Sequence, residues 1–127
     1  MIIFFGLPIS CYNTTTEGQM LGFFASAIPK DVIVSLNHPR HQDALNRLGN
    51  KYLMMVLSFC EAGIFLPFQD GYWDCFTASQ ANWLHGHGKE IMVADRSGRL
   101  VLLQHGINGA LILSAEETAK RFQTHHG

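Results

Sequence analysis

The sequence predicts an α+β fold, a mainly antiparallel sheet of about five to six strands with two to four helices packed on one face. Runs rich in β-branched and aromatic residues alternate with segments of helical period along the chain. In the last third, two apolar runs flank a short Ser-Gly turn, which is typical of an antiparallel hairpin. No repeat or linker divides the chain, so we expect a single compact domain over 1–127.

The first third is expected to form a strand, a helix and a second strand. The run IIFFGL at 2–7 ends before a proline, as a buried strand would. Thr14 and Glu17 supply a cap and an acidic first turn for a helix over GQMLGFFASA. The run DVIVSL at 31–36 has the composition of a second strand.

One long helix is expected to follow, from Gln42 to Ala62. Asn37 is its candidate cap, and Pro39 falls near the first turn, where proline is tolerated. The second half of this helix, YLMMVLSFC, is apolar nearly all round. A helix of that kind is enclosed on most sides, by the core or by a neighbouring chain.

The middle of the chain is the least regular part of the sequence. The run IFLPF at 64–68 predicts a strand, and Pro67 suits an edge or a bend better than a central position. Within 69–88, the segment TASQANWLH predicts two helical turns capped by Thr77.

The last third has the clearest pattern. KEIMVAD and RLVLLQ are expected to pair as a hairpin, with Gly98 in the turn. A second turn, HGING, leads into a further short strand, ALIL. Ser114 and Glu117 have the spacing of a capping box, which predicts a helix through about Phe122.

The composition is unusually poor in charge. Asp, Glu, Lys and Arg make up 15% of the chain, against about 25% in ordinary soluble domains. We therefore expect the excess apolar surface to be covered by a second subunit, a partner or a ligand. The formal net charge of −1, with no Lys or Arg between Lys51 and Lys89, argues against nucleic acid as a partner.

The cysteines and the first residues bear on the compartment. Cys11, Cys60 and Cys75 form neither a disulfide framework nor a metal-binding spacing, which favours a reducing, cytoplasmic location. The start MIIFFGLPISC lacks a basic segment, so we interpret it as a strand rather than a signal peptide. No run approaches the ~20 apolar residues of a membrane span, so no membrane partner is expected.

The candidate site is the aromatic segment within 65–87. Aromatic rings with polar tips suit a ligand pocket, although they would equally close the core beneath an irregular loop. The residues expected to face a ligand, with two histidines as the polar rim, are Tyr72, Trp73, Phe76, Trp83, His85 and His87.

These observations favour a non-enzymatic binding protein, a homo-oligomer and most simply a dimer, that holds a small apolar or aromatic ligand. One alternative is a protein-interaction module, such as an inhibitor or immunity-type factor, whose apolar surface its target covers. Another is a small hydrolase or transferase in which Cys75 is the nucleophile and His85 or His87 the base.

No metal or cofactor is expected. The His85-Gly-His87-Gly group, the His38 and His41 pair and the His125-His126 pair are the closest histidines. None has an evident third ligand, and we interpret them as polar loop or tail residues.

Overall fold

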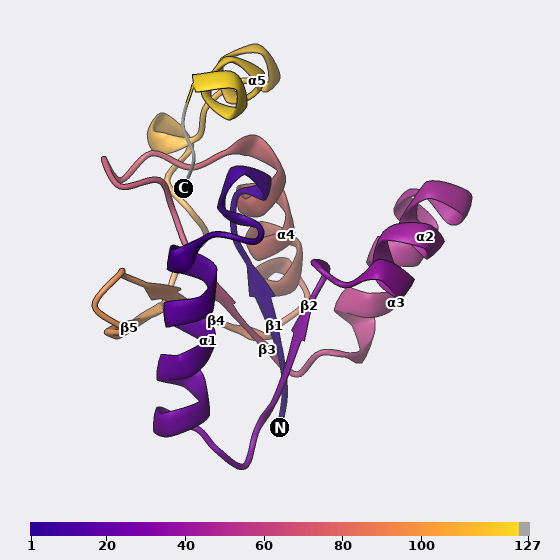
Figure 1. Cartoon of the computed structure of the whole chain (residues 1–127), viewed down its shortest axis with the longest axis vertical. Coiled ribbons are helices and arrows are strands. Elements are labelled where there is room, and N and C mark those ends of the chain that lie inside the picture. The colour runs from indigo at the N-terminus through magenta and orange to yellow at the C-terminus, as the bar shows by residue number, and fades with distance from the viewer. Residues whose placement is uncertain (125–127) are drawn as a thin grey trace.

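The computed structural model describes residues 1–124 and contains a five-stranded mixed sheet in the order β2-β1-β3-β4-β5 (Figure 1). The strands are β1 (Ile2–Gly6), β2 (Val32–Ser35), β3 (Ala62–Phe65), β4 (Glu90–Ala94) and β5 (Leu100–Leu103). The strands β1 to β4 run parallel to one another, and β5 runs antiparallel to β4.

Helices cover both faces of this sheet. They are α1 (Thr15–Ala27), α2 (Pro39–Leu48), α3 (Asn50–Phe59), α4 (Cys75–Gly86) and α5 (Ala115–Thr124), with 3-10 turns η1 (Ile9–Cys11) and η2 (Gly109–Leu111). On one face α1 packs on the sheet, where Phe24 meets Phe5 edge to face at 4.9 Å between ring centroids. On the other face α3 and α4 pack on the sheet around Phe4 and Phe65. The arrangement is that of a doubly wound sheet.

The predicted α+β class is confirmed in its coarse form, since the described chain combines a five-stranded sheet with five α-helices. The prediction of a mainly antiparallel sheet was wrong, because three of the four strand pairings are parallel. Packing of the helices on one face was also wrong. A helix between two strands returns the chain to the same end of the sheet, so the next strand runs parallel and its helix can lie on either face.

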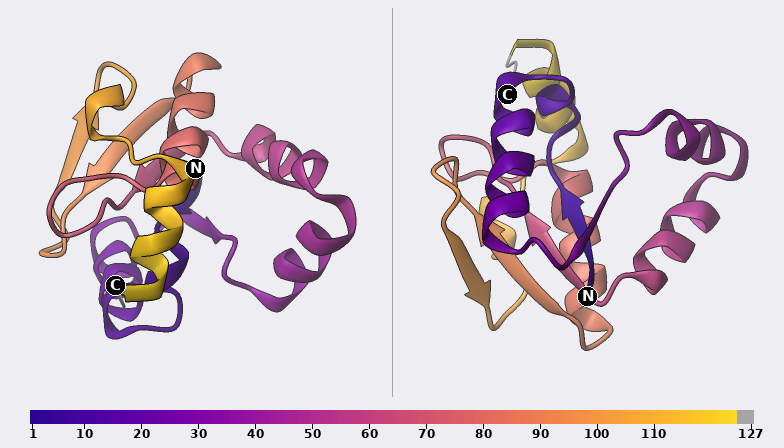
Figure 2. Two further views of the ribbon diagram at one scale, coloured as in Figure 1. Left: turned by 90° about the horizontal axis from the view of Figure 1, so that it is seen from above. Right: turned by 60° about the horizontal axis from the view of Figure 1, so that its bottom comes forward.

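The single helix predicted over 42–62 is two helices. The chain breaks at Gly49, whose φ of 62° strains any residue with a side chain, and α3 then runs at an angle to α2 (Figure 2). The second helix stops at Phe59, because Cys60 turns to an extended conformation and Ala62 already belongs to β3.

Two further elements differ from prediction. The helix α4 begins two residues before Thr77, because Asp74 is its N-cap and accepts the Thr77 N–H at 3.0 Å. The predicted strand ALIL is instead η2 and one isolated bridge between Trp73 and Ile112. The hairpin of β4 and β5 and the capping box of α5 are confirmed, the latter by the Glu117 N–H donating to Ser114 Oγ at 3.1 Å.

A glycine at the end of β1 allows α4 to approach the sheet. A Cβ at Gly6 would lie 2.6 Å from the Phe65 ring and 3.1 Å from Gln80 Oε1. This point is where the strand order reverses, between β1 and β3, and such reversals are where doubly wound sheets bind ligands. Across residues 1–124, no helix has both the length and the apolar character needed to cross a bilayer.

Candidate ligand-binding cleft

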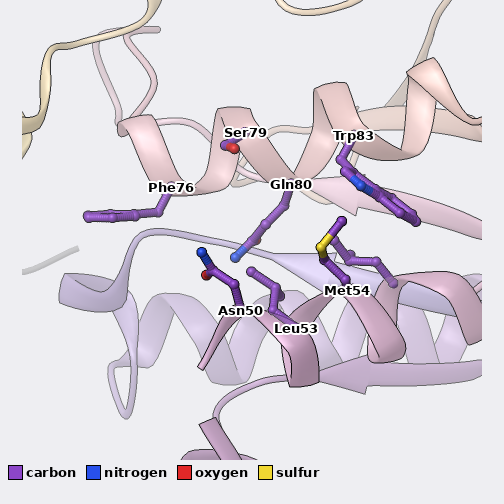
Figure 3. A pocket seen from close by; sticks show the side chains of 8 residues that line it. Asn50, Leu53, Met54, Phe76, Ser79, Gln80 and Trp83 are labelled. Atoms are coloured by element: carbon purple, nitrogen blue, oxygen red, sulfur yellow. The ribbon is translucent and has the colours of Figure 1, made fainter. Parts of the chain in front are cut away.

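A cleft of about 350 Å³ lies between α3 and α4 (Figure 3). Its volume is at the lower end of the ~300–1,000 Å³ range of small-molecule sites. The lining residues are Asn50, Leu53, Met54, Leu57, Phe76, Ser79, Gln80 and Trp83.

Helical periodicity places these side chains on facing stripes. In α4, Phe76, Gln80 and Trp83 are separated by four and three residues and therefore share one face. A neighbouring stripe of α4, with Ala78 and Ala81 fully buried, packs on the sheet. Each helix thus uses one stripe for the core and another for the cleft, and small alanines let α4 lie close to the strands.

The cleft is apolar with a few neutral polar groups. None of its lining side chains is titratable. The half-buried Gln80 extends from α4 into the space between the helices, towards Asn50 and Leu53 (Figure 3). Within residues 1–124 the Gln80 amide has no hydrogen-bond partner. An amide both donates and accepts, so it offers two hydrogen bonds to a molecule in the cleft.

The Trp83 ring forms one wall of the cleft, and its orientation is restricted by His87. The His87 ring stacks on it at 3.7 Å between centroids and 20° between planes. His87 Nδ1 lies 2.7 Å from the Trp83 carbonyl oxygen, which only accepts, so Nδ1 carries the proton of this bond. Stacking and hydrogen bond together restrict the indole orientation.

Lys89 joins the two helices at the far end of the cleft. Its Nζ donates to the carbonyl oxygens of Leu57 at 3.0 Å and Ser58 at 2.9 Å, and lies 5.9 Å from the Trp83 ring. A cation at the carbonyl end of a helix is favourable for both hydrogen bonding and the helix dipole. Lys89 therefore fixes the end of α3 relative to Trp83 of α4.

Two of the six residues expected to face a ligand, Phe76 and Trp83, line the cleft. Trp73 is only 5% exposed and belongs to the core. Tyr72 lies elsewhere, with the Arg121 guanidinium 5.6 Å from its ring. The two histidines are also outside the cleft: His85 borders a separate hollow beside Leu102 and Leu103 of β5, and His87 lies behind Trp83.

The structure does not bring Cys75 close to either histidine. Cys75 begins α4 and His85 is near its end, which at a rise of about 1.5 Å per residue separates them by ~15 Å along the axis. A nucleophile and its base must be within ~3 Å. The Cys75 N–H instead donates to Thr118 Oγ1 at 3.1 Å, which attaches the start of α4 to α5.

The described residues contain no group of three or more His, Cys, Asp or Glu side chains suited to hold a metal ion. The rings of His38 and His41 are 5.7 Å apart, and His41 Nδ1 lies 2.5 Å from the Tyr52 hydroxyl. The His125-His126 pair is outside the described residues.

A second polar group surrounds the loop after β1. Glu17, 7% exposed, accepts from the Asn13 N–H at 2.9 Å and from Asn37 Nδ2 at 2.8 Å. Burial, assisted by the charges of Glu17 and Asp74, raises the pKa of Tyr12 to about 12. These bonds fasten the β1 loop and the end of β2 to the start of α1.

Sequence reasoning missed the α3 side of the cleft. The all-round apolar character of 52–60 indicated that this helix is enclosed, but a sequence pattern does not reveal which helix lies opposite. Comparison of the chain with protein-family models, with curated proteins and with solved structures finds no match.

Proposed function

We propose that this protein binds a small neutral ligand, with a flat apolar body and an amide-like hydrogen-bonding group, in the cleft between α3 and α4. The observation that carries the proposal is the Gln80 amide, half-buried between apolar walls and without a partner in residues 1–124. A polar group removed from water stabilises a complex only when it is hydrogen-bonded there.

The neutrality of the lining supports a neutral ligand. A charged group entering the cleft would lose hydration without meeting an opposite charge, which is costly in an apolar site. The nearby cation, Lys89, is already bonded to two carbonyl oxygens of α3.

The neutral lining of the cleft also favours a binding protein over an enzyme. General acid–base catalysis needs a titratable side chain near the reacting atoms, and none lines the cleft. Ser79 has a hydroxyl, but no lining side chain can act as its base. The alternative of a protein-interaction module would use the exposed apolar surface outside the cleft.

The first experiment is a titration with benzamide, a flat neutral probe carrying one amide, followed by nitrogen-15 NMR. The chain has two tryptophans, so two indole N–H signals are expected. We expect the Trp83 signal to move and the signal of the buried Trp73 to stay. Benzoate, charged, and cyclohexanecarboxamide, not flat, are the matched probes and should shift Trp83 less.

A variant tests the role of the amide. Gln80→Leu keeps the approximate size and removes the hydrogen bonds, which should weaken benzamide binding by about five- to thirteenfold for a lost bond worth ~1–1.5 kcal/mol. Gln104→Leu, on an exposed residue after β5, is the control and should bind as the unaltered chain does. Equal affinity in both variants, or a shift confined to Trp73, would refute the proposal.

A further inference from the structure

The outward face of α3 carries large apolar side chains that nothing in residues 1–124 covers. Met55 is 47% exposed and Phe59 is 71% exposed, and their spacing of four residues places them on one face. Met55 is one residue from the cleft-lining Met54, and therefore about 100° around a helix of 3.6 residues per turn. The exposed stripe and the cleft are separate surfaces of α3.

The shape of the molecule leaves this face accessible. The α2–α3 pair extends away from the sheet, so the outer side of α3 has no element beside it in any view (Figures 1 and 2). Met55 and Phe59 therefore lie open to solvent on a face where a partner would meet no steric obstacle.

Charge at the two ends of α3 is opposite in sign. Lys51 is exposed in the first turn and has no ion-pair partner within residues 1–124. Glu61 is exposed just beyond the last turn, where Oε1 accepts the Ile2 N–H at 3.0 Å and Oε2 is left for a further contact. Two copies of α3 packed antiparallel would place Lys51 of each beside Glu61 of the other.

We propose that a second copy of this chain docks on the outer face of α3, with the two α3 helices antiparallel about a two-fold axis near Met55. The interface is isologous, which means that both copies use the same surface. The stripe of Met55 and Phe59 therefore meets its own copy, and the ion pair between Lys51 and Glu61 occurs twice. Met55 and Phe59 of both copies form its centre at the 8–10 Å interaxial distance of packed helices. The antiparallel arrangement also opposes the helix dipoles, which is favourable.

The proposal is tested by sedimentation velocity on the full chain. We expect a dimer, and we expect Phe59→Glu to sediment as a monomer, because each copy of the variant would bury an unpaired carboxylate at the apolar centre of the interface. The control Val101→Glu introduces the same charge at an apolar side chain of β5 that is 49% exposed, and should remain dimeric. Circular dichroism melting confirms that both variants are folded.

Charge reversal at the exposed residues Lys51 and Glu61 gives a second test. Lys51→Glu should weaken dimerisation by roughly tenfold, since two exposed ion pairs are lost at a few-fold each. The double variant Lys51→Glu with Glu61→Lys should recover most of that loss. A monomeric unaltered chain, or a dimer insensitive to Phe59→Glu and Lys51→Glu, would overturn the proposal. The ligand titration above is independent of either result.

Discussion

At the scale of single residues, Asp74 is both a helix cap, which favours its charged form, and a buried group, which favours its neutral form. It is 1% exposed and caps α4 through Oδ2, while Oδ1 is buried without a hydrogen-bond partner in residues 1–124. Burial raises its pKa, against the hydrogen bonds from Thr77, which lower it. The sequence predicted Thr77 as the cap of α4, and Asp and Thr are both residue types that cap helices well. The choice between them depends on which side chain the tertiary fold buries, which no local pattern records.

The raised pKa makes Asp74 a source of pH-dependent instability. Between its unfolded pKa, about 3.9, and its higher folded pKa, the folded chain binds more protons, so the free energy of unfolding falls as pH rises. Asp74→Asn should therefore gain stability relative to the unaltered chain as pH rises through this window. Urea unfolding at a series of pH values measures the difference.

The control for Asp74 is Asp70, where the sign is opposite. The Arg121 guanidinium, 2.7 Å away, lowers the pKa of Asp70, so its contribution is present above the unfolded pKa and is lost as pH falls. Asp70→Asn should destabilise the chain near neutral pH and have no effect in acid. The same pH trend in both variants would contradict these assignments.

At the scale of elements, local patterns predicted the presence of strands and helices better than the residues at which they begin and end. The capping box before α5 and the apolar runs of β1 and β2 act over a few residues, so the sequence contains the whole cause. The break at Gly49 has another origin. A helical period continues through that residue, and only its left-handed conformation separates α2 from α3.

Glycines inside elements give a paired prediction. Gly22 lies in α1 with open space around its Cβ position, so Gly22→Ala should raise the free energy of unfolding by about 0.5–1 kcal/mol. A Cβ at Gly63 of β3 would lie 2.4 Å from the Phe65 ring and 2.7 Å from Leu84, so Gly63→Ala should lower it by about 1–3 kcal/mol. Thermal and urea unfolding measure both, and effects of equal sign would contradict the packing.

At the scale of the whole molecule, the opposing walls of the cleft could not be derived from the sequence. The cleft joins Leu53 of α3 to Trp83 of α4, thirty residues apart, and only the shared face of the sheet brings them together. The parallel sheet follows from the order of strands and helices, which was visible in the sequence. The hairpin of β4 and β5 drew the interpretation towards an antiparallel sheet because its turn signal is local and strong.

The three cysteines test whether the two layers of the molecule unfold together. Cys11 is buried on the α1 side of the sheet and Cys60 on the α3–α4 side, and burial raises the pKa of both thiols, while Cys75 is partly exposed. Iodoacetamide should alkylate Cys75 in the native protein and reach the other two only through opening. If the chain is one cooperative unit, Cys11 and Cys60 open with the same free energy when mass spectrometry follows each site in dilute urea. Unequal values would show that one helix layer separates from the sheet before the other. Alkylation of Cys75 faster than that of a free cysteine peptide would instead support its role as a nucleophile.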